Sequence, residues 1–464
     1  MATIAHWRRH VNRSLIQNSV VGEALNSQVV DQYCQENGHR WRDSFWSPTM
    51  TVITFLLQVL SAEKTLRAAV AALLVQLTAK GRTDLPSPDA SAYCQARMRL
   101  PGSVITGMAQ RVADKMKDLV NPETGWLGHR VWVVDGSSVS MPDTPELQEA
   151  FPQPQAQKPG CGFPVAQLVG LFCWTTGALL DMVIDSMQPH ELNLVRRLYN
   201  RFRPGDVVLA DRAYSAWVDM VRLWQDGVYC VFRLHQCRRA DFRMGKRLGP
   251  DDQLVTLPKP PQWCASFGIS QEAFERLPES LSVRLIRIKS TPKGFRSRTV
   301  IVVTTLLDPI ATPADAIRGL YRDRWTVELR LRDLKTSLGM DVLRGQSLDV
   351  VRKEIAIHVL AYNLIRLLMW HAAREHDADL HRLSFTGTLH RVRVVLPLLM
   401  FLSHHHVARH IHLSGQLLKW IAEDILPNRP DRMEPRRKKR RPKEYSLLVK
   451  PRAWYRLHGD PHAR

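Results

Sequence analysis

The stretch VWVVD, residues 131–135, marks the point at which the sequence changes from helical to strand-like patterning. Its four apolar residues have the length and composition of a buried strand, and the run ends on the acid Asp135. A second run of the same form, VVLAD, ends on Asp211. Sites in open α/β sheets gather at strand ends near changes of topology. The two acids are therefore candidate site residues, although an Asp after a strand is about as often a simple turn former.

Three further runs have the composition of strands: VAQLVGLFCW, LLDMVIDS and YCVFRL. Between the later strands lie two helix-like segments, HELNLVRRLYNRF (190–202) and SAWVDMVRLWQDG (215–227). Strands followed by strand–helix alternation predict a mixed α/β sheet covered by helices.

The most unusual bulk property of the chain is its charge. Its 464 residues include 65 Lys+Arg against 44 Asp+Glu, a formal net charge of +21. This excess indicates a polyanionic partner, with nucleic acid as the first candidate. A solubility charge or an anionic membrane surface is the alternative. Seven scattered cysteines without a C-x-x-C pair argue against zinc knuckles and disulfide frameworks, and predict a reducing, intracellular setting.

The segment 313–339 predicts one helix, with Pro313 in its first turn and Gly339 past its end. At about 100° per residue, four polar side chains share one arc of roughly 60°: Tyr321, Arg324, Glu328 and Lys335. An apolar stripe lies beside this arc and predicts docking on a core: Leu320, Val327, Leu331, Leu334 and Leu338. The pattern therefore places Glu328 at the rim of a buried face, although solvated helices also carry such Glu–Lys pairs.

Three carboxylates that converge at a sheet edge repel one another and have little use except to bind divalent cations. Two Mg²⁺ ions about 4 Å apart are a standard means of displacement at a phosphodiester. The other polar residues of the helical arc would supply donors and positive charge to the phosphates. The acids, the basic excess and the helix thus all indicate metal-dependent chemistry on a phosphodiester.

The sequence resembles the DDE insertion-sequence transposases of the IS-four family. The resemblance rests on DGSS with MPDTPE, on GDVVLADRAYS, and on the spacing Y-x2-R-x3-E-x6-K, which is the specific motif. GCGFPVAQLVGL, VVTTLLD and DVVRKEIAIHVLAYNLIRLL support it, and it spans residues 85–375 or so.

The resemblance implies an RNase H-like mixed α/β sheet with flanking helices, interrupted by a β-rich insertion. The domain organisation expected on this basis is a helical DNA-binding region at 1–125, a catalytic domain in two parts at 126–235 and 308–376, a basic insertion at 236–307, and a helical region with a basic tail at 377–464.

The resemblance also implies an activity. Such an enzyme cuts at the terminal inverted repeats of its element and joins the 3′-hydroxyl ends to target DNA. The expected cofactor is a pair of Mg²⁺ ions, with Mn²⁺ as a substitute. The alternatives are an RNase H-like nuclease or resolvase that does not join strands, and a non-catalytic DNA-binding relative.

By matching position, the catalytic residues and metal ligands would be Asp135, Asp211 and Glu328. Tyr321, Arg324, Lys335 and Arg212 would contact DNA. The expected partners are double-stranded transposon-end DNA and target DNA, bound by a homodimer in the bacterial cytoplasm at the nucleoid, with no membrane partner.

Other signals carry less weight. Trp263 and Trp325 are candidates to receive a flipped base, but a packing role is the better interpretation of each. The histidines at 404–406 lack carboxylate or Cys companions at ligand spacing. His190 and Glu191 open a helix, and a helix-start role is the better interpretation of both.

Overall fold

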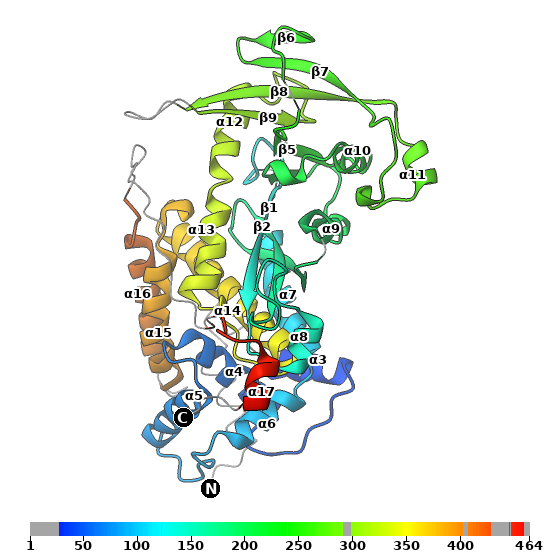
Figure 1. The fold of residues 1–464 in the computed structure, drawn as a ribbon. Helices are drawn as coiled ribbons and strands as arrows, with labels where there is room; N and C mark the ends of the chain where they lie inside the picture. The colour runs from blue at the N-terminus through cyan, green and yellow to red at the C-terminus, as the bar shows by residue number, and fades with distance from the viewer. Residues whose placement is uncertain are drawn as a thin grey trace.

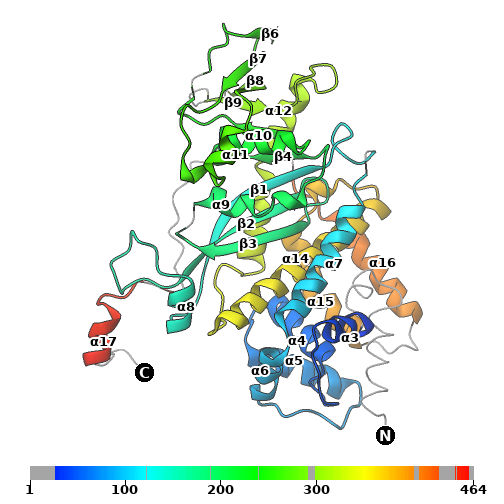
Figure 2. The same cartoon turned by 90° about the vertical axis from the view of Figure 1, so that its right-hand side faces the viewer.

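The computed structural model describes residues 27–121, 123–188, 190–238, 240–290, 298–401, 407–427, 445 and 447–458. The histidines at 404–406 and the basic run at 436–441 lie outside these residues. The N-terminal part is helical, as expected: α3 (Ser27–Glu36), α4 (Pro48–Leu60), α5 (Leu66–Ala79), α6 (Ser91–Arg99) and α7 (Gly102–Asp118). Figures 1 and 2 show α4, α5 and α6 at one end of the molecule.

The described strands form one nine-stranded sheet of order β3-β2-β1-β4-β5-β9-β8-β7-β6. The bounds of the first five are β1 (Val131–Ser140), β2 (Val165–Cys173), β3 (Leu179–Ser186), β4 (Val207–Ala210) and β5 (Tyr229–Arg233). β1, β2 and β3 pair antiparallel, whereas β4 and β5 run parallel to β1. This topology is that of an RNase H-like sheet, so the predicted fold class is confirmed.

The insertion continues the same sheet. Its strands are β6 (Lys246–Gly249), β7 (Asp252–Pro258), β8 (Ser280–Ser290) and β9 (Arg298–Thr304), and β9 pairs antiparallel with β5. In both views these strands lie at the end of the molecule opposite α4, α5 and α6 (Figures 1 and 2). The buried Arg284 of β8 donates to both carboxylate oxygens of Asp252 at 2.8 and 2.6 Å, and to the carbonyl of Thr312 at 2.7 Å. The insertion is thereby tied to the start of the next helix.

The sheet separates two hydrophobic cores, because successive side chains of a strand point to opposite faces. Val131 and Val133 of β1 join the larger core, which α7 and the helices after the insertion cover. Trp132 and Val134 join the second core. That core lies under α9 (Glu191–Arg196), α10 (Trp217–Gln225) and α11 (Gln271–Glu275). The helix expected at 190–202 is shorter than predicted, because α9 ends at Arg196 and only a 3₁₀ turn follows.

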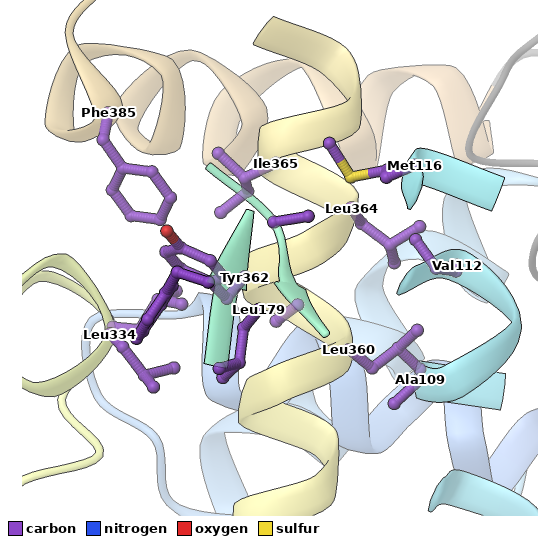
Figure 3. Packing of buried hydrophobic residues seen from close by; sticks show 14 of the residues in the cluster. Ala109, Val112, Met116, Leu179, Leu334, Leu360, Tyr362, Leu364, Ile365 and Phe385 are labelled. Atoms are coloured by element: carbon purple, nitrogen blue, oxygen red, sulfur yellow. The ribbon is translucent and has the colours of Figure 1, made fainter. Parts of the chain in front are cut away.

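The long helix α14 (Leu348–Glu375) runs through the middle of the larger core. Figure 3 shows its Leu360 and Leu364 beside Ala109 and Val112 of α7, and its Tyr362 facing Phe385 of α15 (Phe385–Phe401). By length and composition alone α14 could cross a membrane, but 78% of its most apolar window is buried inside the fold. Two further helices follow: α16 (Val407–Glu423) and α17 (Arg452–His458).

The helix expected over 313–339 is interrupted, and this corrects the sequence prediction. It forms α12 (Ala314–Asp323) and α13 (Thr326–Arg332), followed by the π turn η4 (Asp333–Ser337). At the break, the N–H groups of Arg324 and Trp325 bond carbonyls three residues back, although both residues keep right-handed helical dihedrals. The chain therefore bends without unwinding, and the predicted apolar stripe is buried: Leu320, Val327, Leu331, Leu334 and Leu338.

Buried polar side chains hold α13 and α14 to the turn between β2 and β3. Arg330 donates to the carbonyls of Cys173 and Trp174 at 2.8 and 2.7 Å. Asn363 accepts from the backbone N–H of Leu179 at 2.9 Å and donates to its carbonyl at 2.8 Å. These hydrogen bonds fix where α13 lies along the sheet, and hence the position of Glu328.

Candidate active site

Parallel pairing of β1 with β4 sets the relation between the two aspartates. The register matches Val131 with Val207 and Val133 with Leu209, an offset of 76 residues. The same offset, continued two residues past the last pair, places Asp211 beside Asp135. Neighbouring strands lie about 4.8 Å apart, so the two acids lie at the same level of the sheet. Asp211 directly follows β4, but Asp135 lies inside β1, which continues to Ser140, so the strand expected to end on Asp135 is longer than predicted. Both continue the alternation of the larger core and point toward α13.

Asp135 is the most enclosed of the three acids. Burial raises the pKa of its carboxyl from 3.8 to about 6, although the N–H of Gly136 and the charge of Arg324 work in the opposite direction. The charges of Glu191 and Glu328 raise the pKa further. Burial is thus the main reason that the carboxyl holds its proton to a higher pH, and the nearby acids add to it.

Arg324, at the bend between α12 and α13, lies among the three predicted acids. Its Nη2 donates to Glu328 Oε1 at 3.2 Å. Burial opposes the charge on the guanidinium, but Tyr321 and the surrounding acids more than offset this effect, so the pKa of Arg324 is raised. The acids that contribute are Asp211, Glu328 and Asp135. The guanidinium thus bonds Glu328 and feels the charges of the other two acids.

Tyr321 connects α12 with β4. Its side chain is buried, and its hydroxyl stands 3.5 Å from Asp211 Oδ1. Burial raises the pKa of the phenol to about 12, so the hydroxyl remains a donor at neutral pH. Arg233 approaches the same carboxylate oxygen at 4.0 Å. The Asp211 and Glu328 side chains are 36% and 40% exposed, which leaves both accessible from solution.

The remaining predicted DNA contacts divide into two groups. Lys335 donates to Ser137 Oγ at 2.8 Å, two residues beyond Asp135, so the π turn brings it to the same strand. Arg212 instead bonds Gln236 at 2.8 Å, on the insertion side of Asp211. Trp263 and Trp325 are 39% and 43% exposed, and the indole N–H of Trp263 bonds the carbonyl of Ile269. Which aromatic receives a base stays a prediction.

The donor set suits a hard cation, since carboxylate oxygens are the ligands that Mg²⁺ prefers. Among the residues that the structure describes, however, no three His, Cys, Asp or Glu side chains converge closely enough to bind a metal ion. The contacts explain the gap: Glu328 bonds Arg324, and Asp211 faces Tyr321 and Arg233. Cationic and donor side chains thus lie against the carboxylate oxygens of Asp211 and Glu328.

Glu191 is a site residue whose position the sequence did not reveal. His190 caps α9, as expected, because its Nδ1 accepts from the N–H of Leu192 at 3.2 Å. The Glu191 carboxylate, however, lies against the backbone of Gly136, where an added Cβ would overlap it. It also accepts a hydrogen bond from the hydroxyl of Tyr214. A glycine directly after a candidate catalytic acid was the available signal, because it leaves room for a neighbour.

An RNase H-like sheet with one acid within β1 and a second directly after β4 defines a class of enzymes that act on nucleic acids. A family model described as "Transposase DDE domain" matches residues 126–364. The chain is also 27% identical over 369 residues to "Transposase InsG for insertion sequence element IS4" of Escherichia coli (strain K12), covering 78% of each chain. The chain belongs to the DDE transposase family, of the IS4 type, and is a DNA transposase. Enzymes of this family generally use divalent metal ions.

A solved structure, the piggyBac transposase synaptic complex with hairpin DNA, shows a more distant likeness. It aligns with 91% of this chain and 87% of its own at 10% identity, with a TM-score of 0.39. This likeness is too remote to bear on the assignment.

The raised pKa of Asp135 predicts a pH-dependent stability in the metal-free protein. A raised carboxyl pKa favours folding fully below the unfolded value of 3.8, and that contribution is lost as the pH rises through about 6. At pH 7.5 Asp135→Asn should therefore raise the free energy of unfolding by at most about 3 kcal/mol, and at pH 4 by almost nothing. Urea unfolding at the two pH values in EDTA measures this difference. An equal change in the free energy of unfolding at both pH values would contradict a raised pKa of Asp135.

Proposed function

We propose that the protein is a metal-dependent transposase that cuts the terminal inverted repeats of its own insertion sequence and joins the resulting 3′-hydroxyl ends to target DNA. The observation that supports this proposal is the shared offset of β1 and β4, which, continued two residues, brings Asp135 beside Asp211, while the charge of Glu328 acts on Asp135. Joining as well as cutting is proposed because the chain matches its IS4 relative over most of its length.

In this proposal the three carboxylates would hold two Mg²⁺ ions, with Mn²⁺ as a substitute. When bound, such ions activate the attacking oxygen and stabilise the leaving oxygen of a phosphodiester. Pairing of β1 with β4 up to Val133 and Leu209 sets the level of Asp135 and Asp211 in the sheet, whereas the α13 contacts with the sheet set that of Glu328. The protein thus sets the positions of its ligands before substrate arrives, which reduces the cost of orienting them.

The positive and donor groups around the acids would contact the phosphates on either side of the scissile bond. Arg324 can exchange the acids for a phosphate with little movement, since its guanidinium already lies at the rim of the site. Tyr321 presents a hydroxyl that stays protonated at neutral pH, and Lys335 lies at Ser137. Arg212 would extend this contact toward the insertion. Substrate DNA and the acids therefore compete for the same cationic side chains.

The N-terminal region offers a separate basic surface. A pocket of about 460 Å³ lies between α4, α6 and the loop before α4, and its lining includes Arg40, Arg42, Arg99 and Trp41. All three arginines are exposed, and within the described part of the chain none of them pairs with an acid. Unpaired guanidinium groups around a concave surface are suited to phosphates. This pocket supports the proposal that the helical region at 1–125 binds double-stranded end DNA.

The proposed partners are the two transposon ends and target DNA, assembled by a homodimer so that both ends are processed together. Such substrates place the enzyme at the bacterial nucleoid in the cytoplasm. A nuclease that cuts without joining remains the second candidate for the same site, because cutting needs the same carboxylates. The two differ only in whether the 3′-hydroxyl later acts as the attacking group.

Glu328→Gln should reduce strand joining at least about 1,000-fold, because it removes a charged ligand from the site. End-DNA binding should change less than twofold. Incubation of the full chain with labelled cognate ends, target plasmid and Mg²⁺, followed by gel analysis, measures both steps. Glu272→Gln, at an exposed position of α11, is the matched control and should behave as wild type. Joining that survives Glu328→Gln would remove the catalytic assignment.

Arg40→Ala with Arg42→Ala should weaken end-DNA binding and reduce the slope of log K against log salt by about two, one per lost phosphate contact. Fluorescence anisotropy between 50 and about 300 mM KCl gives the slope. The control is Arg197→Ala with Arg201→Ala, which removes two arginines that are already paired with Asp185 and Asp181. Equal slopes in the two double variants would mean that the pocket does not contact DNA.

A further inference from the structure

Glu191 and Tyr214 form a buried contact behind the catalytic strands. Gly136 and Gln167 belong to the face of β1 and β2 that carries the second core, opposite the side of Asp135. The Glu191 carboxylate lies on this face, against Gly136, with Gln167 Nε2 3.5 Å from its Oε2. Its other oxygen, Oε1, accepts from the Tyr214 hydroxyl. The pair therefore stands on the far side of the sheet from α13.

Tyr214 is held close to the second aspartate. It ends the 3₁₀ turn η2 (Arg212–Tyr214), which follows Asp211 directly, and its N–H bonds the carbonyl of Asp211 at 3.2 Å. Only 3% of the residue is exposed. Burial and the charge of Glu191 raise the pKa of the phenol far above its usual value, so the hydroxyl remains a donor. The hydrogen bond to Glu191 therefore restrains the position of the turn that carries Asp211.

The geometry points to a role for this pair in the reaction: we propose that Glu191 and Tyr214 are positioning residues that brace the Asp135–Gly136 segment against the Asp211 turn. Strand pairing stops at Val133 with Leu209, two residues before the acids. Beyond that point no β1–β4 backbone hydrogen bonds fix the distance between these two strands. The Glu191–Tyr214 bond spans this unpaired part and replaces the missing ladder.

A direct role for Glu191 as a metal ligand fits the contacts less well. Its carboxylate lies behind the strand, and both of its oxygens face protein donors, Tyr214 and Gln167. The brace also explains the need for glycine after Asp135, because a side chain at position 136 would displace the carboxylate. The inference rests on the proposed function, since it assumes that Asp135 and Asp211 share metal ions.

The experiment measures Mn²⁺ affinity of the full chain by electron paramagnetic resonance, together with end cleavage. Tyr214→Phe and Glu191→Ala should each lower Mn²⁺ affinity and cleavage by about tenfold or more, since small displacements of catalytic groups have effects of this size. The double variant should be no worse than either single one, because the two residues act through one bond. Glu191→Gln keeps an acceptor oxygen for Tyr214 and should recover most of both losses.

Tyr199→Phe is the matched control. Tyr199 also donates, from a partly buried position, to a carboxylate, Asp219 Oδ1 at 2.8 Å, on the same side of the sheet. Its loss should lower the melting temperature about as much as Tyr214→Phe does but leave Mn²⁺ affinity unchanged. Equal Mn²⁺ affinities for Tyr214→Phe and Tyr199→Phe would show a merely structural role and overturn the proposal.

Two further outcomes also overturn it. If Glu191→Gln is as damaging as Glu191→Ala while Tyr214→Phe resembles wild type, Glu191 binds the metal directly and no brace exists. If Asp135→Asn leaves Mn²⁺ affinity unchanged, the proposed function itself fails, and the brace fails with it. A loss in Asp135→Asn combined with wild-type affinity in Tyr214→Phe separates the two cases, because only the brace is then wrong.

Discussion

Parallel pairing of β1 with β4 is the constraint on which the site depends. An offset of 76 residues is shared by the paired valines and by the two aspartates that follow them, so the ladder that builds the sheet also sets the acids side by side. The rest of the molecule keeps that arrangement. Core side chains fix both faces of β1, while Arg330 and Asn363 hold the covering helices at one height. A slip of one residue would turn one aspartate to the opposite face.

Acids brought close together repel one another, and cationic side chains of the same protein reduce this repulsion. Asp135 has a raised pKa chiefly because it is buried, with Glu191 and Glu328 raising it and Arg324 lowering it. Arg324 lies at the interruption between α12 and α13, where it bonds Glu328 and is close enough to Asp211 and Asp135 for their charges to raise its pKa. The interruption between α12 and α13 is therefore part of the site, and the π turn that carries Lys335 to Ser137 is a second local departure with the same effect. Such departures from regular helix are common at functional sites.

The sequence predicted the features that depend on residues close together in the chain. Strand composition with terminal acids indicated Asp135 and Asp211, and the apolar stripe from Leu320 to Leu338 predicted the buried face correctly. Periodicity assumes an unbroken helix, so it missed the interruption at Arg324 and Trp325. It likewise could not show that β9 joins β5, or that Glu191 meets Tyr214, because long-range pairing leaves no periodic signal. Glu191 does start a helix, as the sequence predicted, and its hydrogen bond with Tyr214 is an additional contact that the sequence did not show.

Iron-directed cleavage of the backbone tests most directly whether the three carboxylates share metal ions. Fe²⁺ replaces Mg²⁺ in the full chain, and ascorbate with peroxide then generates radicals that cut the backbone close to the bound iron. The account predicts cuts in three separate segments, around residues 135, 211 and 328, all of them suppressed by excess Mg²⁺ and by Asp135→Asn. Cuts confined to one of these segments, or three cuts that persist in Asp135→Asn, would contradict it.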